Sequence, residues 1–394
     1  MKWRKIIFLG IPLVLILGGL AYVVYKYQIE NKNKKDESNQ KNDNQSSQNE
    51  NPINGDNTNK NNSDSNPNLL LNKIRLGHWN VLNQSGNTPT KNLAISKVIL
   101  HNKLDLVGLT EMTNENGVKT IINELNKSSS DKWNYIVSQK KRGTTGSSGQ
   151  AEHVGIIYKE NKLTLEPFDD QEKSKGKFYE NKLWDDPFKK GQKIDYVRPP
   201  FGAKFSTKGN VKNDFSVVFV HSDSPGVSIT KANKEENASG YAGQGHKEVA
   251  EALRTKEVME YFDSIDGVNN ELFFMGDTNI KVGNEAKAFK PLLQSGYKSL
   301  IKDVKENSTS LAQRWGEYAN TYDKIFYKGD LKVENSKFYD LWKVFDDKIL
   351  NKEEFKKAID KNSKNNSEIY YVRSAISDHT LIWTDLILNG NDAT

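Results

Sequence analysis

The sequence predicts a mixed α/β (α+β) fold, and two observations lead to this prediction. From Ile74 onward, short apolar runs rich in Val, Ile, Phe and Tyr alternate with longer segments that have helical periodicity. The short runs have the length and composition of buried or half-buried strands. A wound parallel sheet and a two-sheet sandwich both produce this alternation, so periodicity alone leaves the two architectures open.

The individual elements follow from these runs. Strands are expected at 74–82, 104–112, 133–139, 153–159, 215–222, 271–279, 322–328 and 379–387. Helices are expected near 90–102, 118–126 and 246–264, with a peripheral lysine-rich helix within 346–366. The polar stretches 171–193, 226–245 and 303–317 predict surface loops.

The chain divides by composition into three parts: 1–27, 28–70 and 71–394. Hydrophobic residues make up 35% of the 394 residues, but they are concentrated in the first part and in the short runs of the third. The absence of cysteine excludes a disulfide framework, a thiolate metal site and a cysteine nucleophile. A net charge of +6 is mild for a protein dedicated to binding nucleic acid.

Residues 6–25 contain no charged side chain, which predicts a single membrane-spanning helix. At 1.5 Å per residue this stretch spans about 30 Å, the thickness of a hydrocarbon core. It exceeds the roughly 7 to 15 apolar residues of a signal peptide. We therefore expect an uncleaved signal-anchor, with a cleaved signal peptide as the alternative. Lys2, Arg4 and Lys5 would stay cytoplasmic and place the body outside the cell.

Residues 28–70 consist mainly of Asn, Lys, Ser, Gln and Asp. Such a segment cannot bury enough apolar surface to offset its chain entropy. We expect it to be a disordered tether between the anchor and a globular domain at 71–394.

Polar residues gather at the ends of the predicted strands: Asn80, Glu111, His221, Asp277 and Asn279 at C-terminal ends, with Asp378 and His379 before the last strand. Any one of them alone could be a turn or cap residue. As a set of carboxylates, amides and histidines without cysteine, they favour a hard divalent cation, Mg²⁺ foremost and Mn²⁺ or Ca²⁺ as alternatives. The histidines can transfer protons near neutral pH.

The strings WNVL, LTEM, HSDSPG, MGDTN, YDKIFY and SDHTLI occur in order between Trp79 and Ile382. In this order they resemble the endonuclease/exonuclease/phosphatase superfamily, which includes DNase I. The anchor, the tether and HSDSPG together look like the surface membrane nucleases of mollicutes. The resemblance implies a DNase I-like, four-layered α-β-β-α sandwich over 71–394 and metal-dependent hydrolysis of phosphodiester bonds.

The resemblance also implies a metal site and a phosphate site. Glu111 would be the principal metal ligand, with Asn80 and Asp378 completing or positioning the site. Asp277 and Asn279 would hold the scissile phosphate.

Two histidine–carboxylate pairs carry the implied proton transfers. His379, paired with Asp323, would deprotonate the attacking water. His221, oriented by Glu152, would protonate the leaving oxygen or stabilise the charged phosphate. Arg198 matches an arginine that contacts substrate phosphate.

The remaining candidate residues have a simpler expected role in packing or at the surface. These are the other histidines, His78, His101, His153 and His246, and the tryptophans, including Trp79.

Together these expectations describe a single-pass membrane protein with an extracellular catalytic domain that cleaves DNA, or RNA, for nucleotide scavenging. Its partners would be nucleic acid and, through residues 6–25, the lipid bilayer, with no obligate protein partner. A sphingomyelinase-type lipid phosphodiesterase is one alternative, but the long loops are rich in Lys, Gly and Asn and not in apolar residues. The other alternative is a catalytically inactive binding protein, which would have no need for two histidine–carboxylate pairs.

Overall fold

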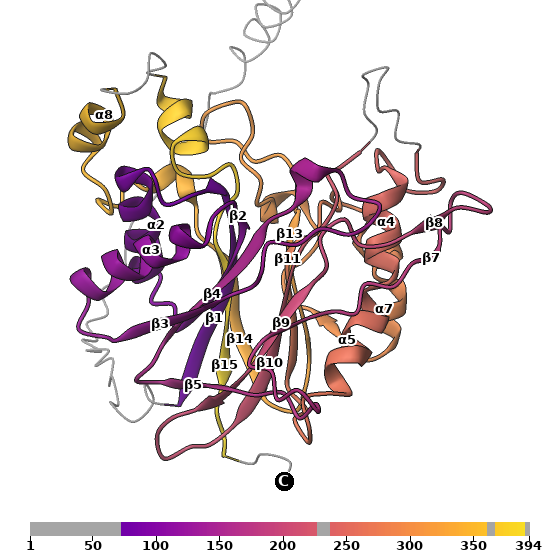
Figure 1. The fold of residues 1–394 in the computed structure, drawn as a ribbon. Helices are drawn as coiled ribbons and strands as arrows, with labels where there is room; N and C mark the ends of the chain where they lie inside the picture. The colour runs from indigo at the N-terminus through magenta and orange to yellow at the C-terminus, as the bar shows by residue number, and fades with distance from the viewer. Residues whose placement is uncertain (1–71, 227–236, 361–366, 391–394) are drawn as a thin grey trace, which may run out of the picture. The chain divides into compact units, whose positions relative to one another are not determined.

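Two β-sheets pack face to face in the computed structural model, which describes residues 72–226, 237–360 and 367–390 (Figure 1). The first sheet has the strand order β14 (Lys332–Phe338), β15 (Ile382–Ile387), β1 (Lys73–Gln84), β2 (Leu106–Met112), β4 (His153–Lys159) and β3 (Trp133–Val137). The second sheet has the order β12 (Lys298–Ser299), β13 (Asp323–Lys328), β11 (Leu272–Asp277), β10 (Asp214–His221), β9 (Phe201–Thr207) and β5 (Leu163–Glu166). Short β6 (Lys177–Phe178) also pairs with β9, while β7 (Trp184–Asp185) and β8 (Lys193–Ile194) pair with each other.

Helices cover the outer face of each sheet (Figure 1). On the first sheet these are α2 (Pro89–His101), α3 (Glu115–Ser128) and α8 (Lys352–Asp360). On the second sheet they are α4 (His246–Leu253), α5 (Thr255–Asp263), α6 (Glu285–Ala288) and α7 (Lys290–Gln294). Single helical turns η2 (Ser148–Gln150), η3 (Lys305–Asn307), η4 (Leu341–Lys343) and η5 (Tyr370–Ser374) lie in the connections.

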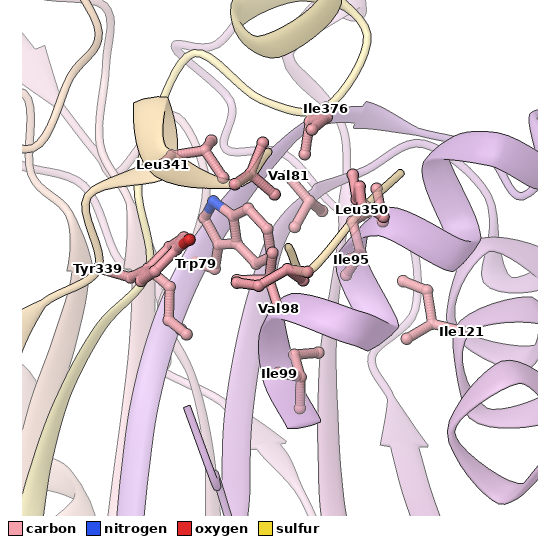
Figure 2. Packing of buried hydrophobic residues seen from close by; sticks show 14 of the residues in the cluster. Trp79, Val81, Ile95, Val98, Ile99, Ile121, Tyr339, Leu341, Leu350 and Ile376 are labelled. Carbon is pink, nitrogen blue, oxygen red and sulfur yellow. The ribbon is translucent and has the colours of Figure 1, made fainter. Parts of the chain in front are cut away.

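Three hydrophobic clusters separate these layers. Trp79, Val98 and Ile121 belong to the cluster between the first sheet and its helices (Figure 2). Along β10, Val217 and Phe219 face the space between the sheets, whereas Val218 and Val220 face the helices of the second sheet. Because both faces of such strands are buried, their sequences are continuous apolar runs. The three interfaces define an α-β-β-α sandwich, which confirms the predicted fold class.

The sheets approach closely where Gly108 of β2 meets the Phe219 ring of β10. A Cβ atom at Gly108 would lie 2.2 Å from Phe219 Cε1, so only glycine fits without displacing the ring. This contact brings the central strands of the two sheets together directly below their functional ends.

The strand directions bring the polar strand ends together. In each sheet one central pair is parallel, β1 with β2 and β10 with β11, and its outer neighbours are antiparallel. The C-terminal ends of β1, β2, β10 and β11 therefore lie beside the starts of β4, β13 and β15. Across the second sheet His221 is in register with Asp277, and Asp277 with Asp323.

The eight expected strands are all present, but other parts of the prediction need correction. The expected helix 246–264 is divided at Arg254 into α4 and α5. The expected loop 171–193 contains β6 and β7, and the loop 303–317 contains η3. Within 346–366 the helix covers Lys352–Asp360, and residues 361–366 lie outside the described ranges. The polar edge strand β14, together with β5 and β9, was not predicted.

The predicted anchor and tether, residues 1–27 and 28–70, lie outside the described residues. Within 72–226, 237–360 and 367–390, no helix combines the length and apolarity needed to cross a bilayer.

Candidate active site

The first histidine–carboxylate pair joins the loop before β15 to the start of β13. His379 Nδ1 donates to Asp323 Oδ2 at 2.7 Å, and both side chains are buried. The backbone of His379 is fixed from two sides. Trp79 Nε1 donates to its carbonyl at 2.8 Å, and its N–H donates to Ser377 Oγ at 3.1 Å. This leaves the other ring nitrogen, Nε2, directed at the carboxylate of Asp277, 3.4 Å away.

The second pair joins the end of β10 to the start of β4. His221 Nδ1 donates to Glu152 Oε1 at 2.8 Å, and its Nε2 lies 3.7 Å from Asp277 Oδ2. Arg198 supports this pair from behind: its Nε is 3.3 Å from Glu152 Oε2 and its Nη1 donates to Ser222 O at 3.0 Å.

Asp277 lies between the two histidines. Its Oδ2 accepts a hydrogen bond from Asn80 Nδ2 at 3.0 Å, and its Oδ1 accepts one from the backbone of Asn279 at 3.1 Å. The Asn80 amide also donates to Glu111 Oε1 at 2.9 Å. A single amide thus links the carboxylates at the ends of β2 and β11, one from each sheet.

Electrostatics keep the His379 pair ionised. Burial lowers the pKa of His379, but the negative charges of Asp277, Asp323 and Asp378 outweigh burial and raise it well above the ordinary value. Burial likewise opposes ionisation of Asp323. The charge and hydrogen bond of His379, followed by the nearby His78 ring, outweigh this and lower the pKa of Asp323. The carboxylate therefore stays charged beneath the ring.

The His221 pair behaves in the same way. Burial and the nearby Arg198 lower the pKa of His221, while Glu152 and then Asp277 raise it, and the net shift is upward. Burial raises the pKa of Glu152, but His221 and Arg198 outweigh it and the net shift is downward.

The backbone is unusual where these side chains leave their strands. Glu111 and Asn279 have φ of 57° and 54°, and Leu82 and Asn83 have 45° and 51°. The pairing of β1 with β2 changes register between Asn80 and Gln84. Left-handed residues and bulges at strand ends re-aim side chains, and they are concentrated at functional sites.

These side chains open into one cavity of about 430 Å³. It is lined by Glu111, His221, Ser224, Pro225, Asp277, Asn279, Ser310, Leu311, Ala312, Gln313, Ala319, Asn320, Tyr322, Arg373, Asp378 and His379. Asn80, Asp323, Glu152 and Arg198 are not part of this lining. They hold the lining residues in place, and Arg198 makes its contacts behind His221.

The oxygen atoms of the cavity suit a hard cation. Glu111 and Asp378 both face it, and the buried Asp378 Oδ1 has no hydrogen-bond partner among the described residues. Asn80 presents its amide nitrogen to Glu111, while its oxygen accepts from the backbone of Leu82 at 3.0 Å. The described residues contain no ready-made group of three or more His, Cys, Asp or Glu side chains for a metal. The candidate ligands therefore fit by their chemistry: two carboxylates with an adjacent amide.

Four residues near the site were not predicted from the sequence. Arg373 lines the cavity, donating from Nε to Leu311 O at 3.0 Å with Nη2 3.5 Å from Asp378 Oδ2. Tyr322 stacks on His379 with ring centroids 6.1 Å apart. Lys91 is buried near Glu111 and Asp378, and its burial lowers its pKa to about 8.

The fourth is His78, which was expected only to pack. It stacks on Phe219, but its Nδ1 also lies 3.4 Å from Asp323 Oδ1, on the side away from His379. The sequence around His78 gives no indication that it contacts Asp323. The contact arises because β1 of the first sheet faces β13 of the second sheet.

The other histidines lie elsewhere. His153 Nδ1 bonds to Ser138 O at 2.9 Å, His246 pairs with Asp186 at 2.8 Å, and His101 packs edge-on against Tyr339. Trp79 is fully buried in the cluster shown in Figure 2, as predicted.

Several solved structures similar to this chain are described as endonuclease/exonuclease/phosphatase family proteins. One from Bacteroides thetaiotaomicron is 13% identical with a TM-score of 0.47, covering 80% of this chain and 98% of that one. One from Bacteroides vulgatus is 14% identical with a TM-score of 0.47, covering 80% and 99%. The human Nocturnin catalytic domain with bound sulfate is 13% identical with a TM-score of 0.46, covering 80% and 95%.

Comparison by sequence gives a shorter match. A protein of Mycoplasma pneumoniae (strain ATCC 29342 / M129 / Subtype 1), described as uncharacterized, is 40% identical over 159 residues. The match covers 39% of this chain and 31% of that protein, so this chain spans under a third of its relative's length. No protein-family model matches the chain.

Proposed function

We propose that this protein is a metal-dependent phosphodiesterase that cleaves DNA, and RNA by the same chemistry. The observation that carries the proposal is the arrangement around Asp277. Two histidines, each bound through Nδ1 to a carboxylate, direct their Nε2 atoms at this one side chain, at 3.4 and 3.7 Å. One histidine can act as base and the other as acid on opposite sides of a single phosphate.

His379 is the proposed base. Its Nδ1–H is held by Asp323, so Nε2 is the nitrogen that would receive the proton of the attacking water. The surrounding carboxylates favour the protonated ring, and a cation held by Glu111 and Asp378 would offset their charge and favour the neutral ring that a base requires. The buried charge of Asp323 stabilises the imidazolium that results. His221 is the proposed acid, because Glu152 favours its charged form and its Nε2 can deliver a proton to the leaving oxygen.

The remaining lining residues position the phosphate. Asp277 and Asn279 are fixed at the end of β11, and Asn279 Nδ2 donates to Ser222 O at 3.3 Å. Arg373 supplies a positive charge to the cavity lining from η5. In this proposal Arg373 takes the phosphate-binding role expected of Arg198, which is engaged with Glu152.

The charge of the cavity supports a metal requirement. Its lining has the carboxylates Glu111, Asp277 and Asp378 but a single arginine, Arg373. Together with the two cationic histidines, this lining has no surplus positive charge for a phosphodiester anion, and a bound cation would supply it. Glu111 and Asp378, with Asn80 beside them, would hold that cation. When bound, it would offset the phosphate charge and stabilise the transition state.

The inactive binding protein is a poorer explanation of these residues. Burying two ionised histidine–carboxylate pairs is costly unless each is well paired, and simple binding gives no reason to keep both. The membrane part of the proposal rests on the sequence alone. In it, residues 6–25 anchor the protein, residues 28–70 act as a spacer and the catalytic domain faces outward.

The test uses the full-length protein in detergent with plasmid DNA and with sphingomyelin in mixed micelles, each with Mg²⁺ and with EDTA. His379→Ala is the active-site variant and His101→Ala, an exposed histidine on α2, is the matched control. Metal-dependent DNA cleavage that only His379→Ala abolishes is the expected result. Hydrolysis of sphingomyelin with intact DNA would replace nucleic acid by lipid as the substrate. If neither substrate is hydrolysed with any divalent ion, the proposal that this protein is a phosphodiesterase is wrong.

The anchor is tested separately on intact cells that express the protein. We expect it in the membrane fraction and digested by added protease without cell lysis. A soluble protein, or one that the protease cannot reach, would contradict the proposed location.

A further inference from the structure

One tryptophan departs from the general expectation that the tryptophans are core residues. Trp315 is 41% exposed, whereas Trp79 and Trp342 are buried. Among the described residues the large exposed apolar side chains are Leu183, Val268, Val304 and Trp315. Trp315 is the aromatic member of this set, and an exposed indole in a defined position suits contact with a ligand.

Trp315 stands at the tip of a short hairpin, residues 311–318. Leu311 and Tyr318 form an antiparallel bridge, and Ala312 N donates to Glu317 O at 2.9 Å. Gly316 supplies the turn with a φ of 76°. The indole is also held from below, because its ring lies 4.9 Å from that of buried Trp342, whose Nε1 donates to Glu317 O at 3.0 Å. The exposed ring is therefore preorganised.

The base of the same hairpin belongs to the active site. Leu311 N donates to the carbonyl of Asp378 at 2.8 Å, and Ser310 forms a bridge with His379. Leu311, Ala312 and Gln313 line the cavity, so Trp315 lies two residues beyond the lining. Arg373 donates to the carbonyl of Leu311 and thus fixes a positive charge at the foot of the hairpin.

From this geometry we propose that the 311–318 hairpin is a subsite for an unpaired nucleotide next to the scissile phosphate, with Trp315 stacking on its base and Arg373 facing its phosphate. The proposal rests on the proposed phosphodiesterase function and specifies single-stranded nucleic acid as its preferred substrate. In a duplex the faces of each base are covered by the neighbouring bases. An exposed indole can therefore stack only on a base of an unpaired strand, and it favours binding of that strand.

The surroundings of Trp315 favour nucleic acid over a lipid surface. Leu311 is only 2% exposed, and the tip also carries Arg314 and Glu317, paired at 2.9 Å and both exposed. Gln313 and Asn320 continue the polar surface into the cavity. A loop that enters a bilayer needs a larger apolar face than one indole.

The test compares kcat/KM of the full-length protein on a single-stranded oligonucleotide, on its duplex and on bis(p-nitrophenyl) phosphate, which has no base. We expect the single strand to be preferred over the duplex. Trp315→Ala should reduce the ratio of single-strand to small-diester activity about tenfold, the usual scale of one base–aromatic contact. Trp315→Phe, which keeps a ring, should restore most of this ratio. Leu183→Ala, at another exposed apolar residue, should leave the ratio unchanged.

The proposal fails if Trp315→Ala lowers both activities equally, if it changes neither, or if the duplex is cleaved as fast as the single strand. Failure of the proposed function looks different, because the wild-type protein would then hydrolyse neither the oligonucleotide nor the small diester. In that case fluorescence anisotropy of a labelled single strand still tests the subsite. The His379→Ala protein should bind this strand about tenfold more tightly than the double variant that also carries Trp315→Ala. Loss of sphingomyelin hydrolysis in Trp315→Ala, with unchanged oligonucleotide binding, would assign the indole to lipid instead.

Discussion

His379 donates from Nδ1 to Asp323 Oδ2 at 2.7 Å, although the two residues are 56 positions apart and come from different sheets. On its other side Asp323 faces His78, whose Nδ1 is 3.4 Å from Asp323 Oδ1. The carboxylate is fully buried and its pKa is lowered, since His379 and His78 outweigh the effect of burial. It therefore acts as a fixed negative charge beneath the proposed base.

This relationship predicts the effect of Asp323→Asn. The amide preserves the shape of the side chain but removes the charge that stabilises the His379 imidazolium and its tautomer. We expect kcat on a phosphodiester to fall by about 10²- to 10⁴-fold, together with a lower melting temperature that still leaves the protein folded at the assay temperature. Steady-state kinetics and thermal unfolding measure the two effects. Asp330→Asn, an exposed position after β13, is the control, and a loss below threefold in Asp323→Asn would remove Asp323 from the mechanism.

The His221–Glu152 pair predicts a dependence on the leaving group. A nitrophenolate leaves readily without a proton, whereas the alkoxide of a sugar does not. We therefore expect His221→Ala to lose about 100-fold more activity on an oligonucleotide than on bis(p-nitrophenyl) phosphate. Glu152→Gln should show the same trend more weakly, because it alters the orientation and charge of His221 and leaves the ring in place. Equal losses on both substrates would mean that His221 stabilises the phosphate and does not protonate the leaving oxygen.

The carboxylates Glu111 and Asp378 predict a measurable metal effect without any turnover. A cation that binds only the folded protein raises its stability, by about 2.7 kcal/mol at a hundred times the Kd. We expect Mg²⁺ or Mn²⁺ to raise the melting temperature of the wild-type protein and EDTA to reverse it. Glu111→Gln and Asp378→Asn should abolish the shift, while Glu334→Gln on the remote edge strand β14 should keep it. A shift that persists in both site variants would place the cation elsewhere.

The parts of the fold that sequence reasoning recovered are those with a strong burial pattern. Strands such as β10 and β11 are covered on both faces, so their apolar runs are unbroken and easy to recognise. β14 was missed because it is an edge strand, KVENSKF, whose exposed lysines and glutamate prevent edge-to-edge pairing and leave no apolar period. The division of the 246–264 helix at Arg254 was also not visible, since the polarity pattern continues across it.

In the candidate site, too, some residues could be predicted from the sequence and others could not. Residues in short ordered motifs, such as Asp277 in MGDTN and His379 in SDHTLI, were identified through a resemblance. His78, Arg373 and Trp315 were not identified, because their importance depends on which distant segments fold against them. For example, Arg373 becomes part of the cavity only because the turn η5 packs against the 311–318 hairpin, and spacing along the chain gives no indication of that contact.

Asp385 predicts how the framework of the site responds to pH. This buried carboxylate accepts hydrogen bonds from Arg75 Nε at 2.6 Å, Arg75 Nη2 at 2.9 Å and Lys73 Nζ at 2.9 Å, and so ties β15 to β1. Burial opposes its ionisation, but the hydrogen bonds from Arg75 and Lys73 lower its pKa to about 2. The opposite ends of these two strands carry Asn80 and the loop of His379.

Because the folded-state pKa lies below the unfolded value of about 3.9, the stabilisation is complete above that pH and is lost as the pH falls through about 2. The shift corresponds to about 2 kcal/mol of folding stability. Asp385→Asn should therefore lower the free energy of unfolding by at least about 2 kcal/mol at pH 7, with a gap to the wild type that narrows between about pH 4 and pH 2. Urea denaturation at several pH values measures this gap. Asp263→Asn, which removes a half-exposed partner of Lys328 at 4.0 Å, should change stability little at any pH, because exposed ion pairs contribute little. A gap for Asp385→Asn that stays constant down to pH 2 would show that the side chain stabilises the strands by shape and not by charge.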